Sequence, residues 1–432
     1  MRHQGSPKVG LAAVHPVRIT ALSWNPVAIA LTLLGAGAVV WLPFLRTAQN
    51  RMVSGEPVSL LQVVQSTPST LGLLLALLLA LLLANVLLGC LPTSVLRSAR
   101  AVLWLQVLMA CALIVLLVVV SAGYARQMAL AQSAISRTSL GGAFWSLLVI
   151  AWLMAADALQ RLRAGAAMRV AWLVATLICV GLLLASGWCD ELSIMKEYAN
   201  RSDLFGAAVL RHLQIVLITL VITLCLGLPI GWWIHQRRSD GAVVFPLLTL
   251  LNVIQTIPSI ALFGLLMAPL ALLAASFPAL AKAGISGVGM APGVIALVLY
   301  SLLPVVRSTL AGLEQVPSAV VSAALGMGLS RPQIALQVQL PLALPVVLSG
   351  LRTATIAAVG MTTITALIGA GGLGAIMFEG LFSSAQDLVL LGVLPIVVLA
   401  VLADMLFKGG IRLVRAATNA GPLDAMEEGV PA

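Results

Sequence analysis

Long apolar runs separated by short polar stretches make up most of this chain. Runs close to the ~20 residues that a helix needs to cross a bilayer occur at 27–45, 70–91, 101–123, 143–159, 170–187, 213–234, 246–267, 291–311, 350–368 and 388–407. We therefore predict an all-α, polytopic bundle of about ten transmembrane helices. A polar stretch precedes the first run, which lacks a clear cleavage-site pattern, so we expect this run to be a retained span.

Composition and charge support a membrane protein and predict its orientation. Hydrophobic residues make up 61% of the 432 positions and charged residues only 9%, which excludes an ordinary soluble domain. Lys and Arg gather in cytoplasmic loops. With the N-terminus inside, 16 of the 24 Lys and Arg residues fall on the cytoplasmic side and 8 outside. Both termini are thus expected in the cytoplasm, and the net charge of +10 reflects orientation and anionic lipid rather than nucleic-acid binding.

The stretch 313–349, which carries few charges and which this orientation places in the cytoplasm, predicts two short helices around a tight corner. Pro317 suits a helix start, and Gly326 and Gly328 permit a sharp turn. A capping box formed by Ser330 and Gln333 predicts the second helix. Small residues here would let another protein approach closely, which favours a docking element. From spacing alone, an ordinary amphipathic connector remains an equal alternative.

The same stretch resembles the cytoplasmic motif of ABC importer permeases. That motif has Glu-Ala-Ala, three residues, Gly, nine residues and Ile-x-Leu-Pro, and this chain matches its spacing from Ser322 to Pro341. Ser322 replaces the Glu, which removes a charge, and Val338 replaces the Ile. The resemblance implies an ATPase-coupling loop, whose residues are Ser322, Ala323, Ala324, Gly326, Gly328, Val338, Leu340 and Pro341.

Residues around this motif, including the glycine-rich run 369–374, are similar to the glycine betaine/carnitine/choline osmoprotectant branch over roughly residues 205–410, about half of the chain. The resemblance implies the permease subunit of a type I ABC importer in a bacterial inner membrane. Its expected partners are a cytoplasmic ATPase dimer, an extracytoplasmic solute-binding protein and a second permease subunit, identical or homologous. ATP and Mg would be bound by the ATPase, and no cofactor is expected on this chain, which has no P-loop.

We predict three regions. Residues 1–203 form an N-terminal membrane block of about five spans and an outer loop, 204–410 the permease core of about five spans with the coupling loop 313–349, and 411–432 a cytoplasmic tail. The leucine-rich run Leu71–Leu88 offers few polar groups, which favours lipid-facing packing or an oligomer contact over a solute path. Nothing in the sequence indicates what the first block does.

A solute path should appear as neutral polar groups along helical faces of the core. One such face combines a polar repeat with Pro258, which frees a backbone carbonyl, and a second follows the ninth span. Packing between helices through Ser and Thr hydroxyls is the alternative for each residue. The candidate path residues are Asn252, Gln255, Thr256, Ser259, Tyr300, Thr355, Thr362 and Thr365.

Other functions find little support in the sequence. The run Gly369–Gly374 fits the dinucleotide fingerprint, but it follows an apolar helix instead of a strand, so we interpret it as a close-packed outer turn. Neither a metal site nor a catalytic cluster of His, Cys, Asp or Glu is indicated. The alternatives left open are a permease for another small solute such as an amino acid, a membrane-embedded enzyme, and a scaffold that transports nothing.

Overall fold

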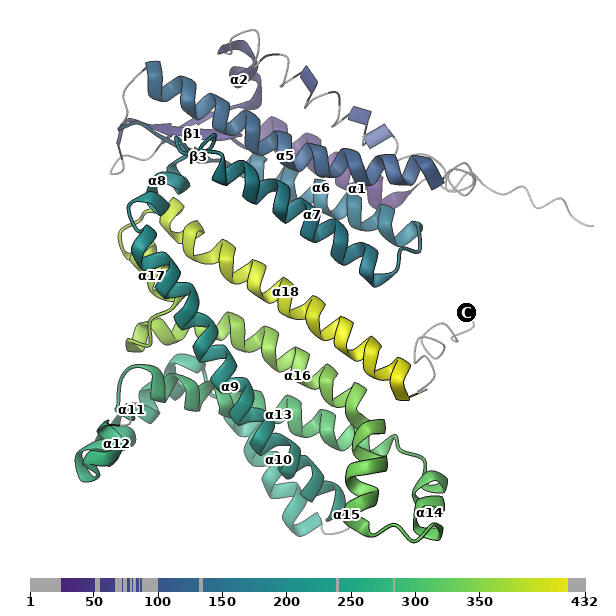
Figure 1. Ribbon diagram of the computed structural model, residues 1–432. Helices are drawn as coiled ribbons and strands as arrows, with labels where there is room; N and C mark the ends of the chain where they lie inside the picture. Colours follow the sequence, from purple (N-terminus) through teal and green to yellow (C-terminus); the bar gives the residue numbers. More distant parts are fainter. Residues whose placement is uncertain are drawn as a thin grey trace, which may run out of the picture.

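The computed structural model describes residues 25–50, 55–66, parts of 72–87, 100–131, 135–237, 241–282 and 284–418 (Figure 1). Its N-terminal block contains α1 (Pro26–Trp41), α2 (Leu60–Ser66), α5 (Arg100–Ala131), α6 (Gly142–Arg161), α7 (Ala166–Ala185) and α8 (Ser193–Ala199). α1 begins at an Asn25 cap, whose amide also donates to the Asp157 carboxylate near the end of α6 at 3.0 Å. The predicted span 70–91 lies mostly outside the described residues.

Three short strands add an element that the all-α prediction lacked. β1 (Leu45–Ala48) lies between β2 (Glu56–Val58) and β3 (Arg137–Leu140), and both pairings are antiparallel. Pro57 lies on the edge strand, where a missing N–H costs no ladder bond. The sheet lies beside α8 at one end of the helix bundle (Figure 1). We call this end, which also holds α17, the sheet end.

The C-terminal core contains helices of 4 to 35 residues. They are α9 (Ser202–Gln236), α10 (Gly241–Thr256), α11 (Ser259–Ser276), α12 (Pro278–Lys282), α13 (Met290–Glu314), α14 (Ser318–Gly326), α15 (Arg331–Ile334), α16 (Leu340–Thr362), α17 (Leu373–Phe382) and α18 (Gln386–Thr418). A π-helical turn, η1 (Ala335–Gln339), leads into α16, and a 3-10 turn, η2 (Ile364–Ile368), follows it. We call the end that holds α14 and α15 the α14 end.

Among the described residues, eight helices are long and apolar enough to cross a membrane, which confirms a polytopic helical membrane protein. Most predicted spans lie within these helices. The predicted span 246–267 is different, because the chain breaks at Ile257 and Pro258 into α10 and α11. α10 packs along the half of α13 towards the α14 end, and Met267 of α11 lies beside Gly287 near the sheet end. α11 is by itself long and apolar enough to cross a membrane, whereas α10 has 16 residues.

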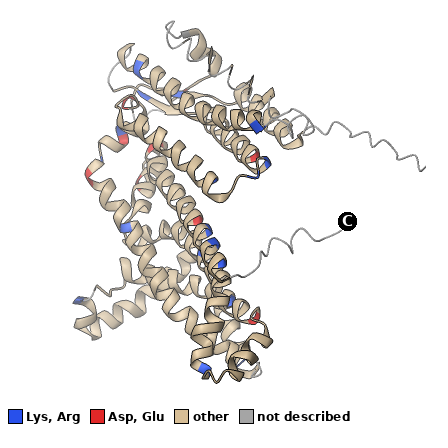
Figure 2. Cartoon of the chain, turned by 45° about the vertical axis from the view of Figure 1, so that its right-hand side comes forward, with Lys and Arg blue, Asp and Glu red and all other residues tan. Residues whose placement is uncertain are grey.

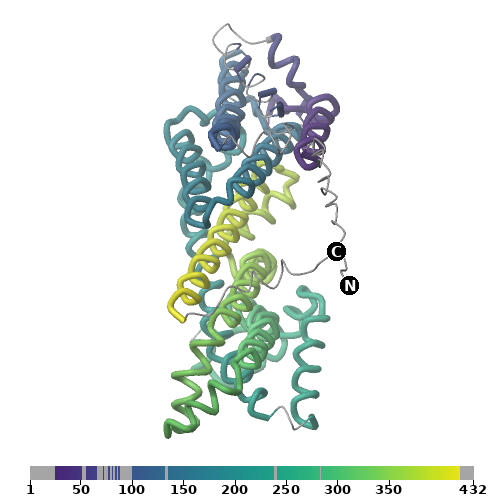
Figure 3. Tube along the Cα trace, turned by 90° about the vertical axis from the view of Figure 1, so that its right-hand side faces the viewer, coloured from purple at the N-terminus to yellow at the C-terminus, as the bar shows by residue number. Residues whose placement is uncertain are grey.

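Glycines bring the core helices into close contact. A methyl group on Gly227 of α9 would lie 2.8 Å from Val305 of α13, and one on Gly312 of α13 would lie 2.9 Å from the Ala343 carbonyl oxygen of α16. Figure 3 shows the N-terminal block above this core, with α18, in yellow, running along both. The core thus consists of a tightly packed α9–α13–α16 unit with α18 beside it.

Charged residues lie mainly towards the helix ends, as expected for segments that cross a bilayer (Figure 2). The helix bounds differ from the predicted region limits. α13 extends to Glu314 and α16 begins at Leu340, so the connection is shorter than 313–349. α18 continues to Thr418, past the predicted boundary at 410, because its apolar pattern continues into a basic last turn.

Candidate functional site

The segment between α13 and α16 has the predicted corner. α14 ends in a glycine-stopped turn, where Gly328 has φ +81°. The amide of Gly328 donates to the Leu325 carbonyl at 2.9 Å, and the amide of Leu329 donates to the Ala324 carbonyl at 3.2 Å. This pair of bonds is a Schellman motif, which requires a left-handed residue at the position of Gly328. The sharp reversal thus depends on this glycine.

The second arm of the corner begins as predicted. Ser330 caps α15, and its amide donates to the Gln333 side chain at 2.8 Å, which confirms the capping box. Val338 lies in the π-helical turn, and Leu340 and Pro341 begin α16. In α14, Ala324 is buried, whereas Ser322 and Ala323 are exposed. The predicted motif residues therefore form one continuous segment, with Ala324 facing inward.

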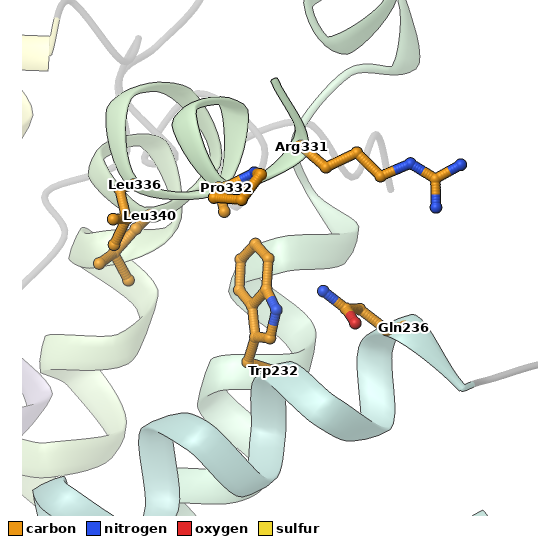
Figure 4. Close-up of a pocket in the computed structure, with 7 residues that line it drawn as sticks. Trp232, Gln236, Arg331, Pro332, Leu336 and Leu340 are labelled. Atoms are coloured by element: carbon orange, nitrogen blue, oxygen red, sulfur yellow. The ribbon is translucent and has the colours of Figure 1, made fainter. Parts of the chain in front are cut away.

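Large apolar side chains are exposed on this corner. Leu325, Met327 and Leu336 are each more than half exposed. Between the end of α9 and α15 lies a hollow of about 350 Å³, in which Trp232 stands facing Pro332 with Gln236 beside it (Figure 4). Arg331 extends away from its rim (Figure 4). Exposed apolar side chains beside a hollow are typical of a protein-docking site.

The first predicted polar face lies between α10 and α13. Tyr300 of α13 donates its hydroxyl to the Ile257 carbonyl at the helix break, and the Gln255 amide donates to the Tyr300 carbonyl at 2.9 Å. Asn252 is one turn away from Gln255. Thr256 bonds back to its own helix at the Val253 carbonyl. The break at Pro258 thus leaves a carbonyl that a side chain of the neighbouring helix satisfies.

Sequence reasoning missed one member of this face. The Arg307 guanidinium donates to the Asn252 side-chain oxygen at 2.8 Å, and the side chain is exposed. Tyr300 and Arg307 are seven residues apart, which places them on one side of α13. That spacing could have identified Arg307 from the sequence. We call Asn252, Gln255, Tyr300 and Arg307 the polar face. Ser259 begins α11 on the other side of the break.

The second predicted stripe has a different environment. Thr355, Thr362 and Thr365 are buried, and their hydroxyls donate to carbonyls of their own segment at 2.7 Å. Thr365 also packs against Gly293 of α13. The structure therefore separates these threonines from the exposed polar face. They lie inside the packed α9–α13–α16 unit.

The glycine run 369–374 forms a tight turn at the sheet end. Gly369, Gly371 and Gly372 all have φ near +80°, a region that other residues rarely adopt. The turn is attached to the core because the Arg211 guanidinium donates to the Ala370 carbonyl at 3.2 Å. It follows η2 and leads into α17, with no strand before it. A close-packed turn thus describes this run, and a dinucleotide fingerprint does not.

Two family models match the chain, one in each half. Residues 24–195 match the ABC transporter permease YehY, N-terminal domain, a likeness that sequence reasoning missed. Residues 227–414 match the binding-protein-dependent transport system inner membrane component. The second match contains the polar face and the α14–α15 corner.

Several characterised proteins resemble the C-terminal half. The osmoprotectant import permease protein OsmW of Salmonella typhimurium is 35% identical over 217 residues, which are 50% of this chain and 93% of OsmW. The glycine betaine/carnitine/choline transport system permease protein OpuCD of Bacillus subtilis is 34% identical, over 45% of this chain and 77% of OpuCD. A solved structure, the inward-facing MetNI methionine ABC transporter, aligns with a TM-score of 0.44 and 21% identity over 50% of this chain and 98% of the matched chain.

Proposed function

We propose a function for this chain from the family to which it belongs. The chain is a member of the binding-protein-dependent transport system inner membrane components, the permease subunits of ABC importers. It is therefore a multi-pass membrane transport subunit. The predicted ABC permease core in the C-terminal half agrees with the matched residues 227–414. From this premise we infer the solute, the orientation, the coupling site and the path.

The proposed solute is a quaternary-ammonium osmoprotectant such as glycine betaine, carnitine or choline. Relatives that are 32–35% identical are named for these solutes or for osmoprotectant import. Such solutes are small and carry at most one carboxylate beside the ammonium. A face of neutral polar groups suits them, and its one cation suits those that carry a carboxylate. We place initial recognition on an extracytoplasmic binding protein, because the polar face offers a single aromatic ring and no cage for an ammonium group.

The α14 end is proposed to face the cytoplasm and the sheet end the outside, as the excess of cations in the predicted cytoplasmic loops indicates. Both termini would then be cytoplasmic. Reporter fusions at Met195 and Ala335 should therefore report opposite sides of the membrane. If both report the same side, this orientation is wrong.

The single observation that best supports ATP-driven transport is the α14–α15 corner. Its exposed Leu325, Met327 and Leu336 form an apolar surface, and the hollow beside Trp232 could accept a side chain of a partner. We propose that a cytoplasmic ATPase dimer docks on this surface. ATP and Mg would be bound by that ATPase. Closure of the ATPase would move the corner and, through α9 and α16, the core helices of two paired permease subunits.

The solute path is proposed to follow the polar face, since this face is accessible in the single chain. Gln255 and Arg307 are exposed on it, and Asn252, Ser259 and Tyr300 are half-buried. Arg307 would supply the positive charge for a carboxylate. The buried Thr355, Thr362 and Thr365 would instead stabilise the helices that carry the path.

Gly328 gives the sharpest test of coupling. A side chain at its left-handed φ costs roughly 1–2 kcal/mol, and Gly328→Asp also adds a charge to the apolar docking surface. We expect normal membrane abundance, lost uptake and lost stimulation of ATP hydrolysis by the loaded binding protein. Gly409→Ala is the matched control, because Gly409 lies in α18, outside the corner, and a methyl group there would meet nothing within 4 Å. Uptake and hydrolysis are measured side by side in vesicles, and wild-type coupling in Gly328→Asp would refute the docking role.

A further inference from the structure

A chain of alternating charges joins the N-terminal block to the core at the sheet end. Arg137 of β3 pairs with Glu197 of α8 at 3.4 Å, Glu197 pairs with Arg201 at 2.8 Å, and Arg201 pairs with Glu379 of α17 at 2.5 Å. Glu197 is only 2% exposed, whereas Glu379 is 53% exposed. We call these four residues the charge chain. It runs from the buried Glu197 in the N-terminal block to the exposed Glu379 on the core.

A second contact lies beside the charge chain. The Ser139 hydroxyl of β3 donates to the Asp387 carboxylate of α18 at 2.5 Å. Ile194 of α8 packs both against the N-terminal core and against a cluster of Ile376, Leu388 and Leu391 in α17 and α18. Sheet, α8, α17 and α18 are thus connected by polar and apolar contacts at the same end of the molecule.

α17 and the start of α18 form one closely packed hairpin. A methyl group on Gly380 would lie 2.5 Å from the Val389 amide nitrogen, and one on Gly392 would lie 2.8 Å from Met377. Backbones this close leave little room for the two helices to move separately. A force on Glu379 or on Asp387 therefore acts on the whole hairpin.

The turn that leads into the hairpin is attached to the core at the sheet end. The glycine turn before α17 is held by Arg211 of α9, and the Gly289 amide at the start of α13 donates to the Ile368 carbonyl at 2.7 Å. Ala370 in this turn is 2% exposed. To open the sheet end, the turn and the hairpin must separate from α9 and α13.

From these contacts we propose that the N-terminal block acts as a latch on the permease core. The charge chain and the Ser139–Asp387 bond hold the α17–α18 hairpin in its closed position, and the outer end opens when the Arg201–Glu379 link parts. This inference rests on the proposed function for its direction, since the sheet end is taken as the outer end. It assigns a role to the N-terminal block.

Of the pairs in the charge chain, the Arg201–Glu379 ion pair is the one that can separate, because the Glu379 side chain is exposed to water. Glu197 keeps two cationic partners and is buried, so breaking its pairs would leave an uncompensated buried charge. The Glu379 side chain is already more than half exposed, so water reaches its carboxylate. A partly exposed ion pair shifts an equilibrium by no more than about fivefold, and salt weakens it. A latch of this strength holds the closed state without preventing turnover.

The test measures opening directly, without a solute. The full chain, with its native cysteines replaced by Ser and with Ala370→Cys as the probe, is placed in lipid nanodiscs and labelled with a water-soluble maleimide. We expect Glu379→Gln to raise the labelling rate about two- to fivefold, the change expected for one partly exposed pair. Glu379→Asp should restore part of the protection. Asp203→Asn removes a carboxylate from the same end without altering the charge chain and should leave the rate unchanged.

Salt provides an independent measurement. Raising salt from about 0.1 to 1 M shortens the screening length from ~10 to ~3 Å, so labelling of the wild-type latch should accelerate and that of Glu379→Gln should not.

Cross-linking tests whether the link must part during transport. In vesicles, linking Arg201→Cys to Glu379→Cys with a short bifunctional thiosulfonate should abolish uptake until the link is reduced. A wild-type labelling rate in Glu379→Gln, or undiminished uptake after cross-linking, would overturn the latch. Should the wild type transport none of the proposed solutes, the proposed function fails, while the labelling result still decides on the latch.

Discussion

Gly231 of α9 lies directly against Thr309 of α13: a methyl group on Gly231 would come within 2.6 Å of the Thr309 Cβ and 3.1 Å of the Val306 carbonyl oxygen. Thr309 is buried, and its hydroxyl donates to the Val305 carbonyl at 2.8 Å. The helices approach each other here because neither residue carries a bulky side chain towards the other. This contact fixes the spacing between the helix that carries the hollow and the helix that carries the polar face.

Gly231→Ala is therefore expected to destabilise the core by about 1–3 kcal/mol, the usual cost of overpacking a well-filled contact. Thermal unfolding in detergent should show a lower midpoint, and membrane abundance should fall. Gly206→Ala serves as the control on the same helix, because a methyl group on Gly206 meets nothing within 4 Å. That variant should keep the wild-type midpoint or raise it, since Ala favours the helix by up to ~1 kcal/mol. Equal midpoints for the two variants would argue against close packing at Gly231.

Cys189 offers a prediction about pH. Burial, together with the neighbouring Asp190, raises the pKa of the Cys189 thiol from 9.0 to about 11. The folded state thus holds its proton more tightly than the unfolded state, so this contribution to stability is complete below about pH 9 and is lost as pH rises towards about 11. Alkylation of Cys189 at pH 8 should be slow in the folded chain and fast after denaturation. Cys189→Ser should make stability fall less steeply between pH 9 and 11; an unchanged slope would contradict the assignment.

Local signals predicted the α14–α15 corner well. Gly328, the capping box at Ser330 and the helix start after Pro317 act within a few residues, and each appears as predicted. The π-helical turn at Ala335–Gln339 was not predicted, because its hydrogen-bond shift leaves no mark on the apolar pattern. The sequence indicated that Pro258 frees a backbone carbonyl. It did not show that the chain breaks there into two helices, because the run 246–267 is apolar on both sides of Pro258.

Contacts between distant segments could not be predicted from the sequence. Arg201 and Glu379 are 178 residues apart, and nothing local indicates that they pair. The strands of the sheet have three or four residues each, too few to show an alternating pattern. α17 has ten residues and follows a glycine turn, so it resembles a loop. The location of the polar face was predicted, but burial of Thr355 and exposure of Gln255 depend on tertiary packing.

A glutamate introduced at Ser322 and one introduced at Ala324 of α14 should have opposite effects on transport. Ser322 is exposed, and Glu is expected there by resemblance, so Ser322→Glu should keep uptake and ATPase stimulation at wild-type levels or above. Ala324 is 2% exposed, and a carboxylate buried there without a partner is costly. Ala324→Glu should therefore uncouple hydrolysis from uptake, or lower abundance. Paired assays in vesicles decide the matter; loss of coupling in Ser322→Glu would mean that Ser322 contacts its partner too closely for a longer side chain.

Arg307 should distinguish solutes by their carboxylate. Its guanidinium is exposed beside Asn252 on the polar face, where it could pair with the carboxylate of glycine betaine or carnitine, while choline has none. Losing one charged hydrogen bond of about 1.5–3 kcal/mol predicts that Arg307→Gln lowers uptake of the carboxylated solutes at least about tenfold and leaves choline uptake nearly unchanged. Thr362→Val is the control, because Thr362 is buried and its hydroxyl donates to the Ala358 carbonyl of its own helix. This variant should lower abundance without changing the ratio between solutes. Uptake of labelled betaine and choline by the same vesicles gives that ratio. An equal loss for both would show that Arg307 supports the structure of the path and does not read the solute.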